Sequence, residues 1–320
     1  MASGYEGGIK MKKLSLIILA FVALFLTSCD KDPQTNPEET NLVTVTLELP
    51  VDNGSKTDFS DFLTGNAINP NFSIKWRTDI QETVYLAVPT IQYEDEDGNI
   101  TTTGKAQIIP LKATEGNGSS VMTFIGVVDS KLLRSTLTYT LYYMGDGNVT
   151  TKENEGIING LEMSFDNQDG SKANLGRCHF ATMNVGVQLL KADDSVIGYI
   201  LKSLDANNTN FNTQVALAYL DLKDETELSG ASKGVSVMYN TSTNKFDVKY
   251  LYSSNNTISL TNPSEKSLVV LAPGIKTISC TKGSYTFDKG VGANKVYYNV
   301  RTYANGQTPE VVPLKLELNT

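Results

Sequence analysis

The side chains best suited to covalent or metal chemistry in this 320-residue chain are few: three cysteines and one histidine, His179. A lone histidine largely excludes metal sites built from several imidazoles and weakens any serine–histidine–aspartate arrangement. Cys178 and Cys280 are far apart in sequence. They could pair in an oxidising compartment or stay buried thiols, because nothing in their spacing demands a bridge. Cys29 differs from both, because it directly follows an apolar segment.

That apolar segment has the layout of a secretory signal. Lys12 and Lys13 give a positive start, residues 14–26 are apolar, and small or polar residues lead into Cys29. The run is shorter than the ~20 residues that a lasting membrane-spanning helix needs. We therefore expect a signal peptide over residues 1–28, with Met11 as the true initiator.

The tetrapeptide Leu26-Thr27-Ser28-Cys29 resembles the bacterial lipobox. The resemblance implies cleavage just before Cys29 and acylation of its thiol, which anchors the chain by ~0.8 kcal/mol per buried methylene. An ordinary secretory signal with an incidental cysteine is the alternative. Residues 29–41 are rich in Pro, Asn, Thr and Glu, a composition that predicts a disordered tether. Asp30 also resembles the surface-export signal of outer-membrane lipoproteins in some Gram-negative anaerobes.

Composition and local motifs argue against several function classes. A net charge of −8 and a pI near 4.9 disfavour nucleic-acid partners, which need a basic face. Residues 94–99 resemble half a calcium loop but lack the later glutamate, and Asp97-Gly98 reads equally well as a hairpin turn. Ser135 and Ser284 have no recognisable nucleophile motif around them. Trp76 is either part of a sugar-stacking platform or a core residue. We expect no enzyme activity, cofactor or metal.

Short runs of alternating polar and apolar residues predict an all-β fold after residue 41. Turn residues separate the runs, and many short strands at regular spacing favour β-sandwiches. A polar stretch over residues 164–172 suggests a domain boundary, which we place between residues 42–177 and 178–320, with about seven strands in each half. The expected strands cover residues 42–49, 84–88, 106–109, 121–127, 137–143, 185–190, 214–220, 234–239, 245–252, 268–272 and 295–303.

The two ends of this β region share one pattern, with four apolar side chains on one face of each strand. They are Val43, Val45, Leu47 and Leu49 at the first strand, and Val312, Leu314, Leu316 and Leu318 at the last. Two such strands could occupy the same place in a sheet, since alternate side chains fill pockets while the main chain pairs with its neighbours. Residues 53–57, which include Lys56, form a polar segment of the kind that proteases cut. The alternative is that both are ordinary sandwich strands.

The order of these features resembles the fimbrillin family, the subunits of type V pili of Gram-negative anaerobes. The matching pieces are the lipobox, the tether, the first strand, Ser55 to Phe59, Ile74 to Trp76, Val84 to Leu86, Thr123 to Gly126, Tyr139 to Tyr143, Leu268 to Pro273, Gly283 to Phe287 and Lys295 to Tyr298. The resemblance implies two transthyretin-like β-sandwich domains and a lipoprotein precursor. It also implies that the first strand is lost by proteolysis and replaced by the C-terminal strand of a neighbouring pilin subunit.

One residue departs from the family pattern. Stalk subunits are typically cut after arginine, whereas the matching position here is Lys56, and the first arginine is Arg77, directly after Trp76. Either the protease accepts lysine, or the chain stays uncut and keeps its lipid as the anchoring subunit in the outer membrane. A surface lipoprotein that binds glycans or host proteins without polymerising is a further alternative, and a cell-surface hydrolase is the least favoured.

Overall fold

The computed structural model describes residues 42–50, 63–64, 67–68, 76, 81–94, 100–114, 121–145, 149–192, 195–205, 211–252, 256–264, 267–287, 289–297 and 313–317. In these residues the regular structure is almost entirely β-strand. The helical elements described are α2 (Lys172–Arg177) and a 3-10 turn (Ser130–Leu132). The predicted all-β class is therefore confirmed.

The first part of the fold is an eight-stranded sheet that closes on itself. Its order is β13-β1-β8-β7-β4-β9-β12-β14, and β12 also pairs with β13. Because β14 pairs only at the start of β12, the other seven strands form a closed ring of pairings, which we call the ring. The strands are β1 (Leu42–Pro50), β4 (Thr83–Val88), β7 (Gln107–Thr114), β8 (Val121–Asp129), β9 (Tyr139–Met144), β12 (Phe180–Ala192), β13 (Ser195–Ser203) and β14 (Asn212–Thr213).

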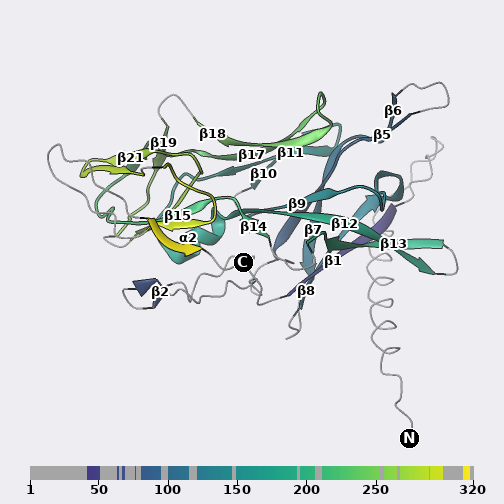
Figure 1. Cartoon of the computed structure of the whole chain (residues 1–320), viewed down its shortest axis with the longest axis horizontal. Coiled ribbons are helices and arrows are strands. Elements are labelled where there is room, and N and C mark those ends of the chain that lie inside the picture. The colour runs from purple at the N-terminus through teal and green to yellow at the C-terminus, as the bar shows by residue number, and fades with distance from the viewer. Residues whose placement is uncertain are drawn as a thin grey trace, which may run out of the picture.

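The remaining strands form smaller sheets, seen toward the other end of the molecule and above the ring in Figure 1. Three of them have four strands each. Their orders are β10 (Val149–Asn154), β11 (Ile157–Ser164), β17 (Gly234–Asn240), β18 (Lys245–Leu251); then β20 (Ser267–Leu271), β15 (Ala216–Leu220), β23 (Lys295–Tyr297), β24 (Pro313–Glu317); then β19 (Thr257–Ser259), β16 (Glu227–Ser229), β21 (Thr277–Cys280), β22 (Gly283–Thr286). Two short hairpins pair β2 (Leu63–Thr64) with β3 (Ala67–Ile68), and β5 (Ile91–Glu94) with β6 (Ile100–Thr103).

Two hydrophobic cores share β4, β7, β9 and β12, which we call the shared wall. Side chains of a strand alternate between its two faces. On β9, Leu141 and Tyr143 lie in the core inside the ring, whereas Tyr142 and Met144 lie in the second core, with β11, β15, β17 and β20. Buried apolar residues on both faces explain why this strand reads as a nearly continuous apolar run.

Strand pairing does not break at the boundary predicted between Arg177 and Cys178. β12 and β13 follow that boundary and pair with β9 and β1, which precede it. Conversely, β11 precedes the boundary and pairs with β17. A compositional break along the chain reports only local polarity, whereas these pairings join strands that are distant in sequence. The division into two domains stays a prediction.

The outer edge of β20 is covered by a buried side chain rather than by another strand. The amide of Gln168 donates to the carbonyl oxygen of Val270 (3.1 Å), and its oxygen accepts from the Val270 N–H (2.7 Å). Leu268 N–H donates to the Gly170 carbonyl oxygen (2.9 Å). The amide of Gln168 thus makes the two hydrogen bonds that a neighbouring strand would make, and the sheet ends at β24 on its other side.

Candidate strand-exchange site

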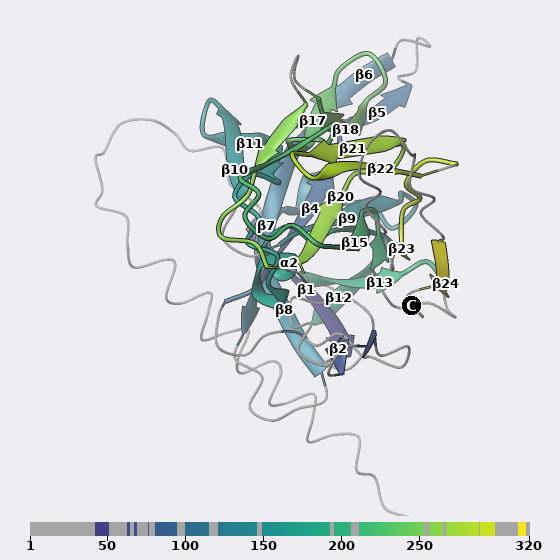
Figure 2. The ribbon, with the colours of Figure 1, turned by 90° about the vertical axis from the view of Figure 1, so that its left-hand side faces the viewer.

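β1 lies between β8 and β13, and we call the place that it occupies the β1 slot (Figure 2). All nine residues of β1 pair with β8 in antiparallel register, from Leu42 opposite Asp129 to Pro50 opposite Val121. On the other side, Thr44 to Leu47 pair with β13 in parallel register. β1 is therefore a central strand of the ring, with main-chain partners on both sides.

The inward side chains of β1 are part of the ring core. Val45, Leu47 and Leu49 are buried, Leu47 to 1% exposure, and Val43 packs against them at the rim. Their cross-strand neighbours are also core residues, with Phe124 and Leu201 on either side of Leu47. Full burial of each such side chain contributes about 1.5–3 kcal/mol, so removal of β1 would leave a gap in this core.

The outward face of β1 is also enclosed. Thr44 is 7% exposed and Thr46 is 3% exposed, although both face away from the ring core. Thr46 lies between Ile125 of β8 and Ile200 of β13, and its hydroxyl oxygen is buried without a hydrogen-bond partner in the part of the chain that the structure describes. Toward the ends of the strand, Glu48 and Leu42 are exposed.

A glycine permits the close parallel approach of β1 to β13. Gly198 lies opposite Thr44, and a Cβ at Gly198 would be 2.9 Å from the carbonyl oxygen of Thr44. Side chains almost never approach a backbone oxygen so closely. Gly198 therefore defines how near the main chain in the β1 slot comes to β13.

A cluster of aromatic side chains around Trp76 lies in the core inside the ring. Trp76 is 2% exposed and makes edge-to-face contacts with Phe124 (centroids 5.0 Å apart), Tyr143 (5.3 Å) and Phe211 (6.2 Å). Of the two interpretations of Trp76, the core residue is confirmed and the sugar-stacking residue is wrong. Phe124 contacts Trp76 and also lies opposite Leu47, so Trp76 supports the strand beside β1.

Tyr199 of β13 lies beside β1 and links β13 to the 3-10 turn that follows β8. Its ring is buried opposite Val45, and its hydroxyl donates to the carbonyl oxygen of Ser130 (3.1 Å). Burial raises the pKa of Tyr199 above its usual value, with the charge of Asp129 adding to the shift and that of Arg134 opposing it. The hydroxyl therefore stays protonated at physiological pH and keeps its hydrogen bond.

The C-terminal strand lies in a different sheet from β1. Among the described strands β24 pairs with β23 alone, through Tyr297 opposite Pro313, Val296 opposite Leu314 and Lys295 opposite Glu317. Figure 2 shows it beside β23, and in Figure 1 its yellow arrow is far from the purple arrow of β1. Leu314 and Leu316 lie within β24, whereas Val312, Leu318, Cys29 and Lys56 fall outside the described residues.

The residues considered for other chemistry are separate from this site. His179 is buried, and its Nε2 lies 3.0 Å from the Thr213 hydroxyl. Cys178 and Cys280 are free thiols, the first buried and the second half-buried. Ser135 and Ser284 are exposed. The calcium-loop residues 95–99 lie outside the described part of the chain, and within that part no three His, Cys, Asp or Glu side chains are grouped as a metal ion would require.

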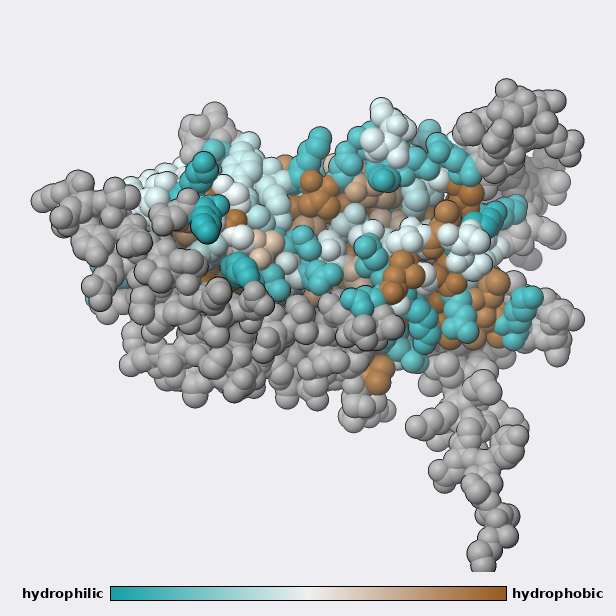
Figure 3. Space-filling model, viewed as in Figure 1, coloured by the Kyte–Doolittle hydropathy of each residue, from teal (hydrophilic) through white to brown (hydrophobic). Residues whose placement is uncertain are grey.

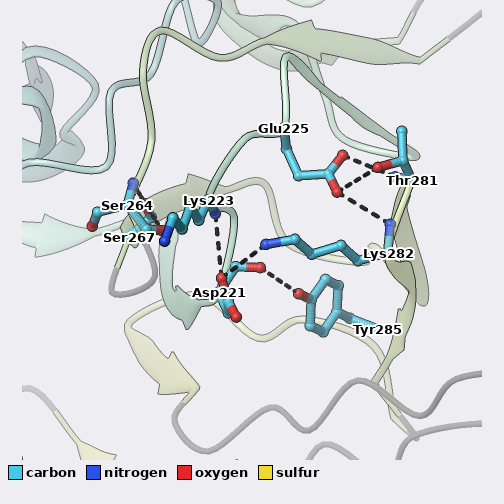
Figure 4. A network of polar contacts seen from close by, with 8 residues as sticks. All are labelled: Asp221, Lys223, Glu225, Ser264, Ser267, Thr281, Lys282 and Tyr285. Carbon is cyan, nitrogen blue, oxygen red and sulfur yellow. Dashed lines mark hydrogen bonds and ion pairs between the residues drawn. The ribbon is translucent and has the colours of Figure 1, made fainter.

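A buried carboxylate occurs in the second part of the fold (Figure 4). Glu225 is 3% exposed and accepts hydrogen bonds from the Thr281 N–H (2.9 Å), the Thr281 hydroxyl (2.7 Å) and the Lys282 N–H (3.1 Å). Burial alone would raise the pKa of Glu225, but these hydrogen bonds outweigh it and hold the pKa below its usual value. These three hydrogen bonds hold the turn between β21 and β22 against the segment that carries Glu225.

Among the described residues, no helix has the length and apolar character needed to cross a membrane. Large apolar side chains are nevertheless exposed, and brown patches are visible on the face shown in Figure 3. Among the exposed large apolar residues, Leu189 belongs to β12, Ile197 belongs to β13, and Leu204 directly follows β13.

No protein-family model matches the chain, and no curated protein sequence matches it. Solved structures with some likeness include the tip fimbrial protein Mfa3 from Porphyromonas gingivalis, at 10% identity over 85% of this chain and 99% of that chain, with a TM-score of 0.39. A candidate cell adhesion protein from Parabacteroides distasonis is 10% identical over 86% and 95% of the two chains, with a TM-score of 0.36. A fimbrial assembly protein from the same species is 9% identical over 80% and 88%, with a TM-score of 0.28. All three TM-scores are below 0.5, so these likenesses carry no argument about the fold or the function of this chain.

Proposed function

We propose that this chain is a structural subunit of a cell-surface fimbrium, exported as a lipoprotein and assembled by strand exchange to support adhesion. The observation that carries the proposal is the position of β1. It is a central, buried strand, and residues 51–75, which include Lys56, join it to the next core residue, Trp76. A cut at Lys56 would leave β1 held in its slot only by noncovalent contacts.

Loss of β1 would leave the ring with an unfilled core and unpaired main-chain groups, which another strand could fill. Val45, Leu47 and Leu49 would leave a gap in the ring core, and β8 and β13 would each lose the main-chain partner on one side. An extended segment that supplies alternate apolar side chains and a main chain restores both. The gap therefore favours capture of a strand from a neighbouring subunit over a permanently open ring.

The C-terminal strand is the segment best suited to be donated. Within the described part of the chain it has one main-chain partner, β23, so its release breaks a single ladder of hydrogen bonds there. Its apolar positions, Val312, Leu314, Leu316 and Leu318, repeat the pattern of β1. In this proposal the partners of the chain are other pilin subunits, and before processing also the outer membrane, through the lipid on Cys29.

Lys56 supports a second candidate, the anchoring subunit. If the processing protease requires arginine, the first available site is Arg77, which directly follows the buried Trp76. An uncut chain would keep both β1 and the acylated Cys29, and would hold the pilus at the membrane.

Mass spectrometry of the mature N-terminus from the surface fraction tests the proposal. A start at Thr57 is expected for a stalk subunit, and an acylated Cys29 on the full-length chain for an anchor. Lys56→Ala should abolish the start at Thr57, whereas Lys131→Ala, at an exposed lysine elsewhere, should leave it. A mature chain with neither N-terminus would contradict both roles.

A deletion tests the donated strand. Removal of residues 312–320 should leave exported subunits that do not extend filaments, as seen by electron microscopy of the cell surface. Normal filaments from this variant would overturn the strand-exchange proposal. A monomeric product with measurable glycan affinity would instead support the non-polymerising surface lipoprotein.

A further inference from the structure

The β1 slot constrains both faces of its occupant. In a sheet with one solvated face, only alternate residues of a strand are selected by burial. Here Thr44 and Thr46 are buried on the outward face while Val45 and Leu47 are buried on the inward face. Four successive positions of any replacement strand must therefore fit an enclosed site.

The position of Thr46 disfavours a charged side chain. Its cross-strand neighbours are Ile125 and Ile200, and the Thr46 hydroxyl has no hydrogen-bond partner among the described residues. A charged group placed there would lose its hydration without gaining a polar partner, which is strongly unfavourable. A lysine at this position would be costly.

The position of Thr44 disfavours proline. The main chain there pairs with Val127 on one side and Gly198 on the other. Proline has no N–H to donate, so in a strand with partners on both sides it removes a ladder hydrogen bond. The close approach at Gly198 leaves little room for the main chain to move away.

The chain's own C-terminal strand has both of these disfavoured residues. Alignment of the two patterns on Glu48 and Glu317 places Pro313 at the position of Thr44 and Lys315 at the position of Thr46. Proline and lysine are typical of edge strands, where they prevent further pairing, and β24 is an edge strand in its own sheet.

We infer that the β1 slot selects a strand from a different subunit and discriminates against the C-terminal strand of a second copy of this chain. The preferred occupant is an extended segment with large apolar residues at the positions of Val45, Leu47 and Leu49. At the position of Thr44 it has a residue other than proline, and at the position of Thr46 an uncharged residue. This inference rests on the proposed strand exchange, and it adds that the chain assembles into a mixed polymer.

Peptide displacement from the nicked full chain tests the inference. A specific protease site replaces residues 52–58, a fluorophore is attached N-terminal to Leu42, and the folded protein is cut once. Unlabelled peptides then compete with the labelled β1 segment for the slot. Release of the labelled segment is measured as a fall in its fluorescence anisotropy. Four peptides are compared. The first two are residues 41–50 and residues 311–320. The third is residues 311–320 with Pro313→Thr and Lys315→Thr, and the fourth, a matched control, has only Glu317→Gln, which aligns with the exposed Glu48.

We expect the peptide with both substitutions to displace β1 at a concentration at least about ten-fold lower than the native C-terminal peptide. The Glu317→Gln control should behave as the native peptide does. Equal displacement by the native and doubly substituted peptides would overturn the inference while leaving strand exchange intact. Failure of the peptide of residues 41–50 to displace its own labelled copy would overturn the exchange itself.

A change in the slot provides an independent readout. Ile200→Glu places a carboxylate beside the position of Thr46. In this variant the native C-terminal peptide should gain at least several-fold relative to the peptide with Lys315→Thr, because the lysine then has a partner of opposite charge. An unchanged ratio between these two peptides would show that Lys315 does not occupy this position and would overturn the inference.

Discussion

β1 and β24 have nearly the same apolar pattern, yet they occupy opposite kinds of position. β1 has partners on both sides and is buried on both faces, whereas β24 has one partner among the described strands and lies at the edge of its sheet. The residues between the apolar positions account for the difference. Thr44 and Thr46 suit a central strand, and Pro313 and Lys315 suit an edge. The lesson is that the intervening residues decide where such a strand can pair.

The largest loss of stability is expected from a charged residue on the inward face of β1. Leu47→Asp should lower the free energy of unfolding by more than about 4 kcal/mol, because it buries an unpaired carboxylate beside Phe124 and Leu201. Chemical denaturation measures the change. The neighbouring Glu48→Gln, at an exposed position, should stay within about 0.5 kcal/mol of the parent. An unchanged midpoint for Leu47→Asp would mean that β1 is not a core strand.

Disruption of the parallel pairing between β1 and β13 should have the next largest effect on stability. Gly198→Val should destabilise the chain by about 1–3 kcal/mol, because its side chain would press on the Thr44 carbonyl group. Gly186→Val is the matched control, since a Cβ there meets only the end of the Leu204 side chain at 3.1 Å. Equal melting temperatures for the two variants would argue against the close β1–β13 contact.

The outward face of β1 predicts a stabilising substitution. Thr46→Val replaces a buried, unpartnered hydroxyl with a methyl group of similar shape and should raise the free energy of unfolding by about 1 kcal/mol. Thr150→Val, on the exposed face of edge strand β10, should change stability far less. A loss of stability in Thr46→Val would show that the hydroxyl has a partner.

Acidification should weaken the turn held by Glu225 before it weakens β1, and this is the smallest of the expected effects. The pKa of Glu225 is held below its usual value, so its hydrogen bonds add stability above about pH 4.5. This contribution is lost as the pH falls through the lower pKa of the folded state. The protection of the Thr281 and Lys282 amides from hydrogen exchange, relative to their intrinsic rates at each pH, should therefore fall on acidification before that of β1. Glu225→Gln should remove this pH dependence. Simultaneous loss of protection in both regions would contradict the distinction.

Local sequence pattern located many of the strands but not their partners. Alternation over residues 42–49 indicated which side chains of β1 share a face, and Val45, Leu47 and Leu49 are buried together. The local pattern did not predict β11 and β13. In these strands Gly160 and Gly198 interrupt the apolar runs, and glycine in such a place is typical of a turn. Both glycines permit close contacts, Gly160 with Met238 and Gly198 with Thr44. Their role depends on a neighbour that the local sequence does not specify.

The same limit applies to the candidate site. Threonine between apolar residues reads as solvent-facing, so Thr44 and Thr46 gave no signal of burial. Their enclosure depends on β13, which comes from a distant segment and pairs in parallel. Strand order, rather than any motif in residues 42–50, turns these two threonines into part of the site.

The shared wall also has a thermodynamic consequence. β9 contributes Leu141 to one core and Tyr142 to the other, so neither core can melt without exposing apolar surface that belongs to its neighbour. Two modules with separate cores would unfold in separate steps, whereas cores joined through one set of strands unfold cooperatively. A chain built in this way is expected to resist heat and mechanical load as one unit.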